Sequence, residues 1–125
     1  MSLEIELASS IDAAAEARRV LDGMSNELPE QRMRDARLLV SELITNAVRH
    51  AGIADGDPIR LMIVADDGFL RVEIADRGSG FELRAPAPDP ARASGWGLFL
   101  VDELADRWGV EQADPGTLIW FEIDR

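Results

Sequence analysis

The sequence has 125 residues, of which 46% are hydrophobic and 30% are charged, so it is long enough to bury the core of one globular domain. It has no cysteine, a single histidine and no apolar run of the roughly 20 residues that span a bilayer, which excludes disulfides, Cys-ligated zinc, a His-rich metal site and a membrane span. The net charge of -11 disfavours direct binding to nucleic acid, because phosphate backbones attract basic surfaces, and favours a protein partner with a basic patch. Since the N-terminus lacks the pattern of a secretory signal, we expect one cytoplasmic domain over residues 1–125.

The first part of the chain predicts a strand and two helices. Apolar and acidic residues alternate over residues 3–7, which is typical of a half-buried strand. Residues 9–10 are serines that offer an N-cap for a helix ending at about residues 23–24. Pro29 suits the first turn of a second helix, whose apolar residues recur at helical spacing over residues 33–48.

The second part predicts four strands and one helix. Alternating apolar residues over 59–63 and 70–74, with the tight-turn sequence 66–68 between them, favour an antiparallel hairpin. A third helix, starting near Trp96, is predicted to carry on its inward face Leu98, Val101, Leu104, Ala105 and Trp108. A short strand beginning at Val110 and a last strand over residues 117–123 complete the order.

The order strand, helix, helix, strand, strand, helix, strand, strand predicts an α+β fold. Strands joined by tight turns favour a mixed, mostly antiparallel sheet. Three helices, each with one apolar face, would cover one side of this sheet and form a two-layer sandwich. Residues 84–94 are rich in Pro and Ala without a period, and we expect a mobile loop there.

The second predicted helix carries two polar residues that could support chemistry. Glu42 and Asn46 are four residues apart and therefore share a helix face. Oxygen ligands suit Mg²⁺, and Asn46 would bind the ion without adding negative charge beside phosphates. Glu42 could accept a proton from a water or hydroxyl nucleophile. A polar helix edge facing solvent explains the same pair without chemistry.

Two glycine-rich segments lie later in the chain. Asp76 ends a predicted strand and is followed by Gly78 and Gly80. The Asp76 carboxylate could accept a hydrogen bond from the exocyclic amine of adenine. The two glycines would let the backbone approach the adenine ring closely. Gly95 and Gly97 open the third helix, where free N–H groups attract phosphate oxygens. Ordinary structural turns are the alternative for each segment. The chain has no lysine, so a nucleotide would be held without a P-loop lysine.

The order of these motifs resembles that of the GHKL ATPase superfamily. Residues 41–51 resemble its N box, residues 76–81 its first glycine box, residues 94–101 its second, and residues 116–117 its late Gly-Thr box. Within the superfamily, the chain is most similar to the small, stand-alone anti-sigma factor serine kinases of bacteria. The resemblance covers nearly the whole chain and implies a single histidine kinase-like ATPase domain with a Bergerat-type ATP-binding fold.

The resemblance implies a role for each motif. Glu42 would act as general base or orient a water, and Asn46 would coordinate Mg²⁺. Asp76 would bind the adenine amine, with Thr117 in support. The other residues expected to contact ATP are Arg49, His50, Gly78, Gly80, Gly95, Gly97 and Leu98. His50 has a plainer alternative, since a histidine in the last turn of a helix is favoured by the helix dipole.

The resemblance also implies an activity and partners. The protein would transfer the γ-phosphate of ATP to a Ser or Thr of a small anti-sigma antagonist, would sequester a sigma factor, and would form a homodimer through its first strand and first helix. The family often has an arginine directly before the second glycine box, where this chain has Ala93 and, one residue earlier, Arg92. That departure keeps open a non-catalytic ATP-binding module that sequesters a partner. A stand-alone histidine kinase catalytic domain is disfavoured, because the chain has no room for a helix with a phosphoacceptor histidine.

Overall fold

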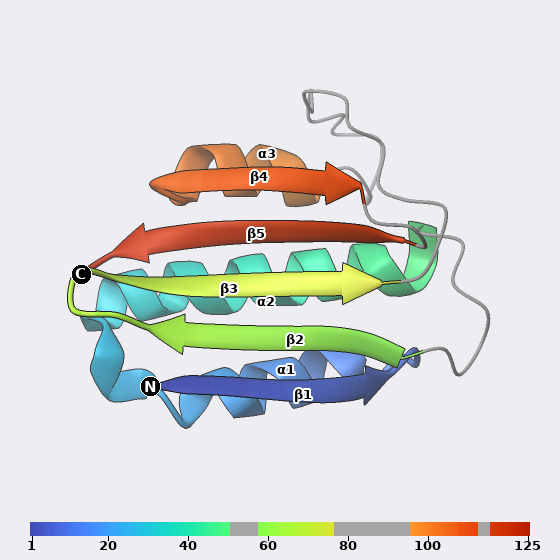
Figure 1. Cartoon of the computed structure of the whole chain (residues 1–125), viewed down its shortest axis with the longest axis horizontal. Coiled ribbons are helices and arrows are strands. Elements are labelled where there is room, and N and C mark those ends of the chain that lie inside the picture. The colour runs from blue at the N-terminus through green and yellow to red at the C-terminus, as the bar shows by residue number, and fades with distance from the viewer. Residues whose placement is uncertain (51–57, 77–95, 113–115) are drawn as a thin grey trace.

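The computed structural model describes residues 1–50, 58–76, 96–112 and 116–125, which form the helices and strands drawn in Figure 1. In chain order the elements are β1 (Ser2–Ala8), α1 (Ala13–Asp22), a short 3-10 helix (Ser25–Glu27), α2 (Glu30–His50), β2 (Pro58–Ala65), β3 (Phe69–Asp76), α3 (Trp96–Leu104), β4 (Arg107–Gln112) and β5 (Thr117–Asp124). The predicted order of strands and helices is confirmed. None of the helices within the described ranges is long and apolar enough to cross a membrane.

The described strands form one sheet in the order β1-β2-β3-β5-β4, and each neighbouring pair is antiparallel. The helices lie together on one face of the sheet, so the domain has two layers (Figure 1). The predicted α+β sandwich is confirmed. We expected a mixed, mostly antiparallel sheet, and every strand pairing among the described residues is antiparallel. The turn between β2 and β3 is the predicted hairpin, in which the Asp66 N–H donates to the Phe69 carbonyl at 2.9 Å.

The core lies between the sheet and the helices. Every second residue of the central strands is buried on this side, namely Ile59, Leu61, Ile63, Leu70, Val72, Ile74, Ile119, Phe121 and Ile123. The facing side of α2 contributes Met33, Ala36, Leu39, Val40, Leu43, Ile44 and Ala47. The two-residue period of the strands and the helical period of α2 therefore place their apolar residues on facing surfaces.

Two local predictions are corrected by the structure. The first helix begins at Ala13 and not directly after Ser9 and Ser10. The Ser10 hydroxyl accepts the Asp12 N–H at 3.2 Å and so forms a turn before the helix. Trp108 lies in β4 and not on α3, which ends at Leu104. Its indole Nε1 donates to an Asp102 carboxylate oxygen of α3 at 3.1 Å. The chain therefore leaves the helix before Trp108, although the helical spacing of apolar residues in the sequence continues to that position.

Candidate nucleotide-binding site

Asp76 and Thr117 occupy adjacent positions where the apolar side of the sheet ends. Asp76 is the last residue of β3, Thr117 is the first residue of β5, and the two are cross-strand partners. Both continue the inward alternation of their strands, and they are 5% and 1% exposed. A carboxylate and a hydroxyl therefore stand where the strand period calls for apolar side chains. Burial of polar groups is costly unless they are hydrogen-bonded, so the pair marks a polar position at the edge of the core.

The Thr117 hydroxyl fits such a ligand. Within the described part of the chain, its Oγ1 atom is buried without a hydrogen-bond partner. Gly116, directly before it, has a φ of 106°, a left-handed conformation that glycine adopts without strain. The glycine and threonine of the predicted late box are thus used differently, one to turn the chain into β5 and the other to present a buried hydroxyl beside Asp76.

Glu42 and Asn46 lie on the partly exposed side of α2. Both side chains are partly exposed, while Leu43 and Ala47 beside them are buried, so the pair stands at the border between core and solvent. The C-terminal end of α2 lies toward the same end of the sheet as the end of β3 and the start of β5 (Figure 1). The structure therefore brings the predicted Glu-Asn face and the Asp76–Thr117 pair to one end of the molecule.

Several predicted site residues lie outside the described residues. Gly78, Gly80 and Gly95 belong to this group, as do the expected loop over 84–94 and the departure at Ala93. Arg49, His50, Gly97 and Leu98 lie within helices, but their side chains lie outside the description. Among the residues that are described, no three His, Cys, Asp or Glu side chains gather in a way that could hold a metal ion.

A hydrogen-bonded contact that the sequence did not suggest holds α1 against α2 beside Glu42. The Arg18 guanidinium donates to the Ser41 hydroxyl at 2.9 Å, and this hydroxyl donates to the Arg37 carbonyl one turn earlier at 2.8 Å. Arg37 also forms an ion pair with Asp22 at 2.5 Å. A serine inside a helix often bonds back to the preceding turn, which is the signal that could have identified Ser41.

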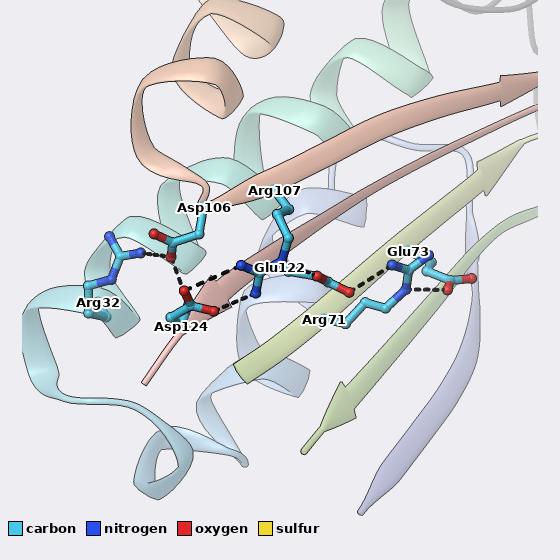
Figure 2. A network of polar contacts seen from close by, with 7 residues as sticks. All are labelled: Arg32, Arg71, Glu73, Asp106, Arg107, Glu122 and Asp124. Atoms are coloured by element: carbon cyan, nitrogen blue, oxygen red, sulfur yellow. Dashed lines mark hydrogen bonds and ion pairs between the residues drawn. The ribbon is translucent and has the colours of Figure 1, made fainter. Parts of the chain in front are cut away.

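The opposite end of the sheet carries a chain of ion pairs (Figure 2). Glu122 accepts from Arg107 at 2.6 Å and from Arg71 at 2.9 Å, and Arg71 also contacts Glu73 at 2.8 Å. Partial burial opposes ionisation of Glu122, but its bonds to the two arginines outweigh this, so its pKa lies below the ordinary value. Hydrogen bonding to Arg107 lowers the pKa of Asp124 in the same way.

Trp120 lies on the sheet face that the helices leave open, because its neighbours Ile119 and Phe121 are buried on the other face. The Arg71 guanidinium stacks over its ring at 4.2 Å from the centroid. On the other side, a Cβ atom added at Gly109 would lie 2.8 Å from the indole nitrogen, closer than real Cβ contacts. Gly109 therefore leaves the space that the indole fills. These contacts build the sheet and lie away from the Asp76 end of β3.

An antiparallel sheet covered on one face by helices, with a buried carboxylate at the end of β3, is the arrangement expected of a histidine kinase-like ATPase domain. Residues 7–123 match the family described as "Histidine kinase-like ATPase domain", and the chain belongs to this family. The match runs from the end of β1 to the end of β5, so the helices, the other four described strands and the candidate site lie inside it.

Two curated relatives and one solved structure are similar to this chain. Serine-protein kinase RsbW of Oceanobacillus iheyensis is 28% identical over 118 residues, which cover 83% of this chain and 75% of that protein. The anti-sigma F factor of Clostridium acetobutylicum is 27% identical over 128 residues, which cover 94% of this chain and 89% of that protein. A crystal structure of the RsbU and RsbW domains of a Mycobacterium tuberculosis protein matches with a TM-score of 0.76 at 23% identity, over 98% of this chain and 31% of that chain. This last likeness supports the fold alone.

Proposed function

We propose that this protein is an ATP-binding serine/threonine kinase of the anti-sigma factor type. The observation that carries the proposal is the buried Asp76–Thr117 pair at the end of the sheet toward which the Glu42–Asn46 face of α2 runs. A carboxylate and a hydroxyl that are both buried fit the polar edge of an adenine ring, and an Asn-Glu helix face fits a Mg²⁺-phosphate group. Membership in the histidine kinase-like ATPase family supports ATP as the nucleotide.

The residues would divide the work between binding and catalysis. Asp76 would accept the adenine amine, with Thr117 beside it, and Asn46 would hold Mg²⁺, which neutralises phosphate charge when bound. Glu42 would accept the proton of the attacking hydroxyl. We propose that Gly78, Gly80, Gly95, Gly97, Leu98, Arg49 and His50 complete the contacts to ATP.

The proposed partners are a sigma factor, which the protein would sequester, and a small antagonist protein, whose Ser or Thr would receive the phosphoryl group. The names of the relatives, serine-protein kinase and anti-sigma F factor, support these partners. The acidic net charge of -11 suits a basic surface on a partner and agrees with a role that does not involve direct binding to nucleic acid. We propose that residues 1–125 act as one domain in the cytoplasm.

A phosphoryl-transfer assay tests the proposal. The purified protein is incubated with ATP radiolabelled in the γ-phosphate and with candidate antagonist proteins, and transfer to Ser or Thr is measured. Glu42→Gln should reduce transfer about 100-fold or more while ATP affinity changes little. Glu111→Gln, which removes an exposed carboxylate on β4, is the matched control and should transfer normally. Equal transfer by Glu42→Gln and the control would contradict the assigned role of Glu42.

A non-catalytic ATP-binding module that sequesters a partner is the second candidate. It is favoured by Ala93, which stands where the family often has an arginine, since positive charge near the γ-phosphate contributes much of the rate of phosphoryl transfer. ATP binding without transfer to any antagonist, together with nucleotide-dependent binding of a sigma factor, would support this candidate against the kinase.

We also propose a homodimer formed through β1 and α1. β1 is an edge strand that pairs with β2 on one side, Leu3 is 38% exposed, and Ile11 in the turn before α1 is 94% exposed. Open strand edges and exposed apolar side chains favour pairing with another chain. Light scattering should give a dimer for the wild type and a monomer for Leu3→Glu. Leu38→Glu, at an α2 position that is 42% exposed, is the matched control and should stay dimeric.

A further inference from the structure

Helix α3 depends on tertiary contacts for its position. It has nine residues, and helices of this length are not stable on their own in water. Among its described side chains, Val101 is fully buried, and Leu100 and Leu104 pack partly against the core. Besides this apolar packing, polar contacts contribute to where the helix lies.

Arg32 of α2 makes such contacts at the C-terminal end of α3. One terminal nitrogen donates to the Leu104 carbonyl at 3.3 Å and to an Asp35 carboxylate oxygen at 3.0 Å. The other terminal nitrogen donates to an Asp106 carboxylate oxygen at 2.5 Å, just beyond the helix end. A guanidinium at this place satisfies a terminal carbonyl and stabilises the negative end of the helix dipole. Its planar fork donates from two separate nitrogens to three acceptors, whereas a lysine would have to reach all of them from a single nitrogen.

Asp106 extends the contact to the sheet. The same carboxylate oxygen that accepts from Arg32 accepts the Asp124 N–H at 2.8 Å, and the Asp106 N–H donates to the Glu122 carbonyl at 2.9 Å (Figure 2). The turn between α3 and β4 is therefore fixed both to α2 and to the end of β5. We call Arg32 and Asp106 the α2–α3 clamp.

We propose that Arg32 is a positioning residue for the phosphate part of the nucleotide site, which it influences by fixing α3 relative to α2. The inference rests on the proposed function. Arg32 lies ten residues before Glu42, roughly 15 Å along the same helix, so it lies too far away to touch phosphates bound beside Glu42. Its other contact, α3, begins at Trp96, next to the glycines proposed to hold the phosphates. The clamp thus connects the helix that carries Glu42 and Asn46 to the helix that begins at the phosphate loop.

The clamp and a merely stabilising ion pair predict different ligand effects. Adenine would be bound by Asp76 and Thr117, which belong to β3 and β5 and have no contact with Arg32 among those described. A displaced α3 should therefore weaken ATP and leave adenosine unaffected. General destabilisation of the fold should weaken both ligands together, so the ratio of the two affinities separates the explanations.

Binding of ATP with Mg²⁺ and of adenosine alone, measured by calorimetry and NMR titration, tests the clamp. Arg32→Ala should weaken ATP about 3- to 10-fold and change adenosine less than about 2-fold. Arg34→Ala is the matched control, because it removes an arginine from the same helix that pairs with Glu30 and has no described contact with α3. This control should leave both affinities unchanged. Equal changes for ATP and adenosine, or equal effects of the two variants, would overturn the clamp.

Two further variants keep the test decisive if Arg32→Ala folds poorly. Arg32→Lys keeps the charge without the fork and should weaken ATP less than Arg32→Ala. Asp106→Asn keeps an acceptor for the Asp124 N–H and should weaken ATP binding by about as much as Arg32→Lys does. Because both residues belong to one contact, the double variant should bind ATP about as well as either single variant. Fully additive effects would contradict the clamp.

A wild type that does not bind ATP would overturn the proposed function, and the clamp with it, whereas normal binding by the wild type and all variants would overturn the clamp alone.

Discussion

The carboxylate of Asp76 and the hydroxyl of Thr117 lie on directly paired residues of β3 and β5, and both side chains are buried. They stand at the ends of two columns of buried apolar residues, which run from Leu70 to Ile74 and from Ile119 to Ile123. Apolar side chains would continue both columns, and the buried Thr117 hydroxyl has no hydrogen-bond partner among the described residues. We propose that the pair serves ligand binding, and this proposal can be tested by measurement.

Asp76→Asn should abolish most nucleotide binding. An amide cannot present the charged acceptor that a carboxylate offers to the adenine amine, and a hydrogen bond to a charged group contributes about 1.5–3 kcal/mol, or about 10- to 100-fold in affinity. Calorimetry should give this loss for both ATP and adenosine. Asp67→Asn, in the exposed turn between β2 and β3, is the control and should bind both normally. Unchanged adenosine binding by Asp76→Asn would refute the assignment of Asp76.

Thr117→Val should separate stability from binding. Valine has nearly the shape of threonine and removes a buried hydroxyl that has no partner among the described residues, so the free energy of unfolding should stay equal or rise by about 1 kcal/mol. Adenosine affinity should fall, because the hydroxyl would be satisfied by the bound ligand. Urea unfolding and NMR titration measure the two quantities. A destabilised variant with normal affinity would mean that the hydroxyl serves the fold.

Gly109→Ala should destabilise the domain by about 1–3 kcal/mol, because the new methyl group would overlap the Trp120 indole. The ring cannot move away without losing its stacking with Arg71. Gly68→Ala, at the hairpin turn where nothing lies within 4 Å of the added atom, is the control and should change stability by less than about 0.5 kcal/mol. Urea midpoints compare the two. Equal midpoints would show that the open sheet face adjusts to the methyl group.

The ion pairs of Glu122 should make stability depend on acid pH. Because its pKa is lowered in the folded protein, Glu122 contributes stability that is fully present above its unfolded pKa and is lost as the pH falls through its folded pKa. Glu122→Gln should therefore be less stable at neutral pH and lose less stability between about pH 5 and about pH 3 than the wild type. Glu111→Gln, an exposed glutamate on β4, is the control. Parallel stability curves for the wild type and Glu122→Gln would exclude this contribution.

The sequence predicted the elements and the layers because these depend on local periodicity. The two-residue alternation of β2, β3 and β5 and the helical spacing of α2 identify the buried faces without knowledge of any partner. The order of the polar motifs likewise predicted Asp76 and Thr117 as site residues. The prediction from local spacing was wrong where a tertiary contact determined the position of a residue. Trp108 continues the helical spacing of α3, yet it lies in β4 and bonds back to Asp102.

Only the tertiary structure decided which residues meet across the molecule. Strand register makes Asp76 and Thr117 neighbours although they are far apart in the sequence, and the packing of α2 against α3 brings Arg32 to Asp106. Neither contact leaves a periodic signal, because each depends on a single pair of side chains held by long-range packing. The sequence by itself determined which face of each strand and helix is apolar. The packing of these faces against one another determined which polar residues, far apart in the sequence, become neighbours.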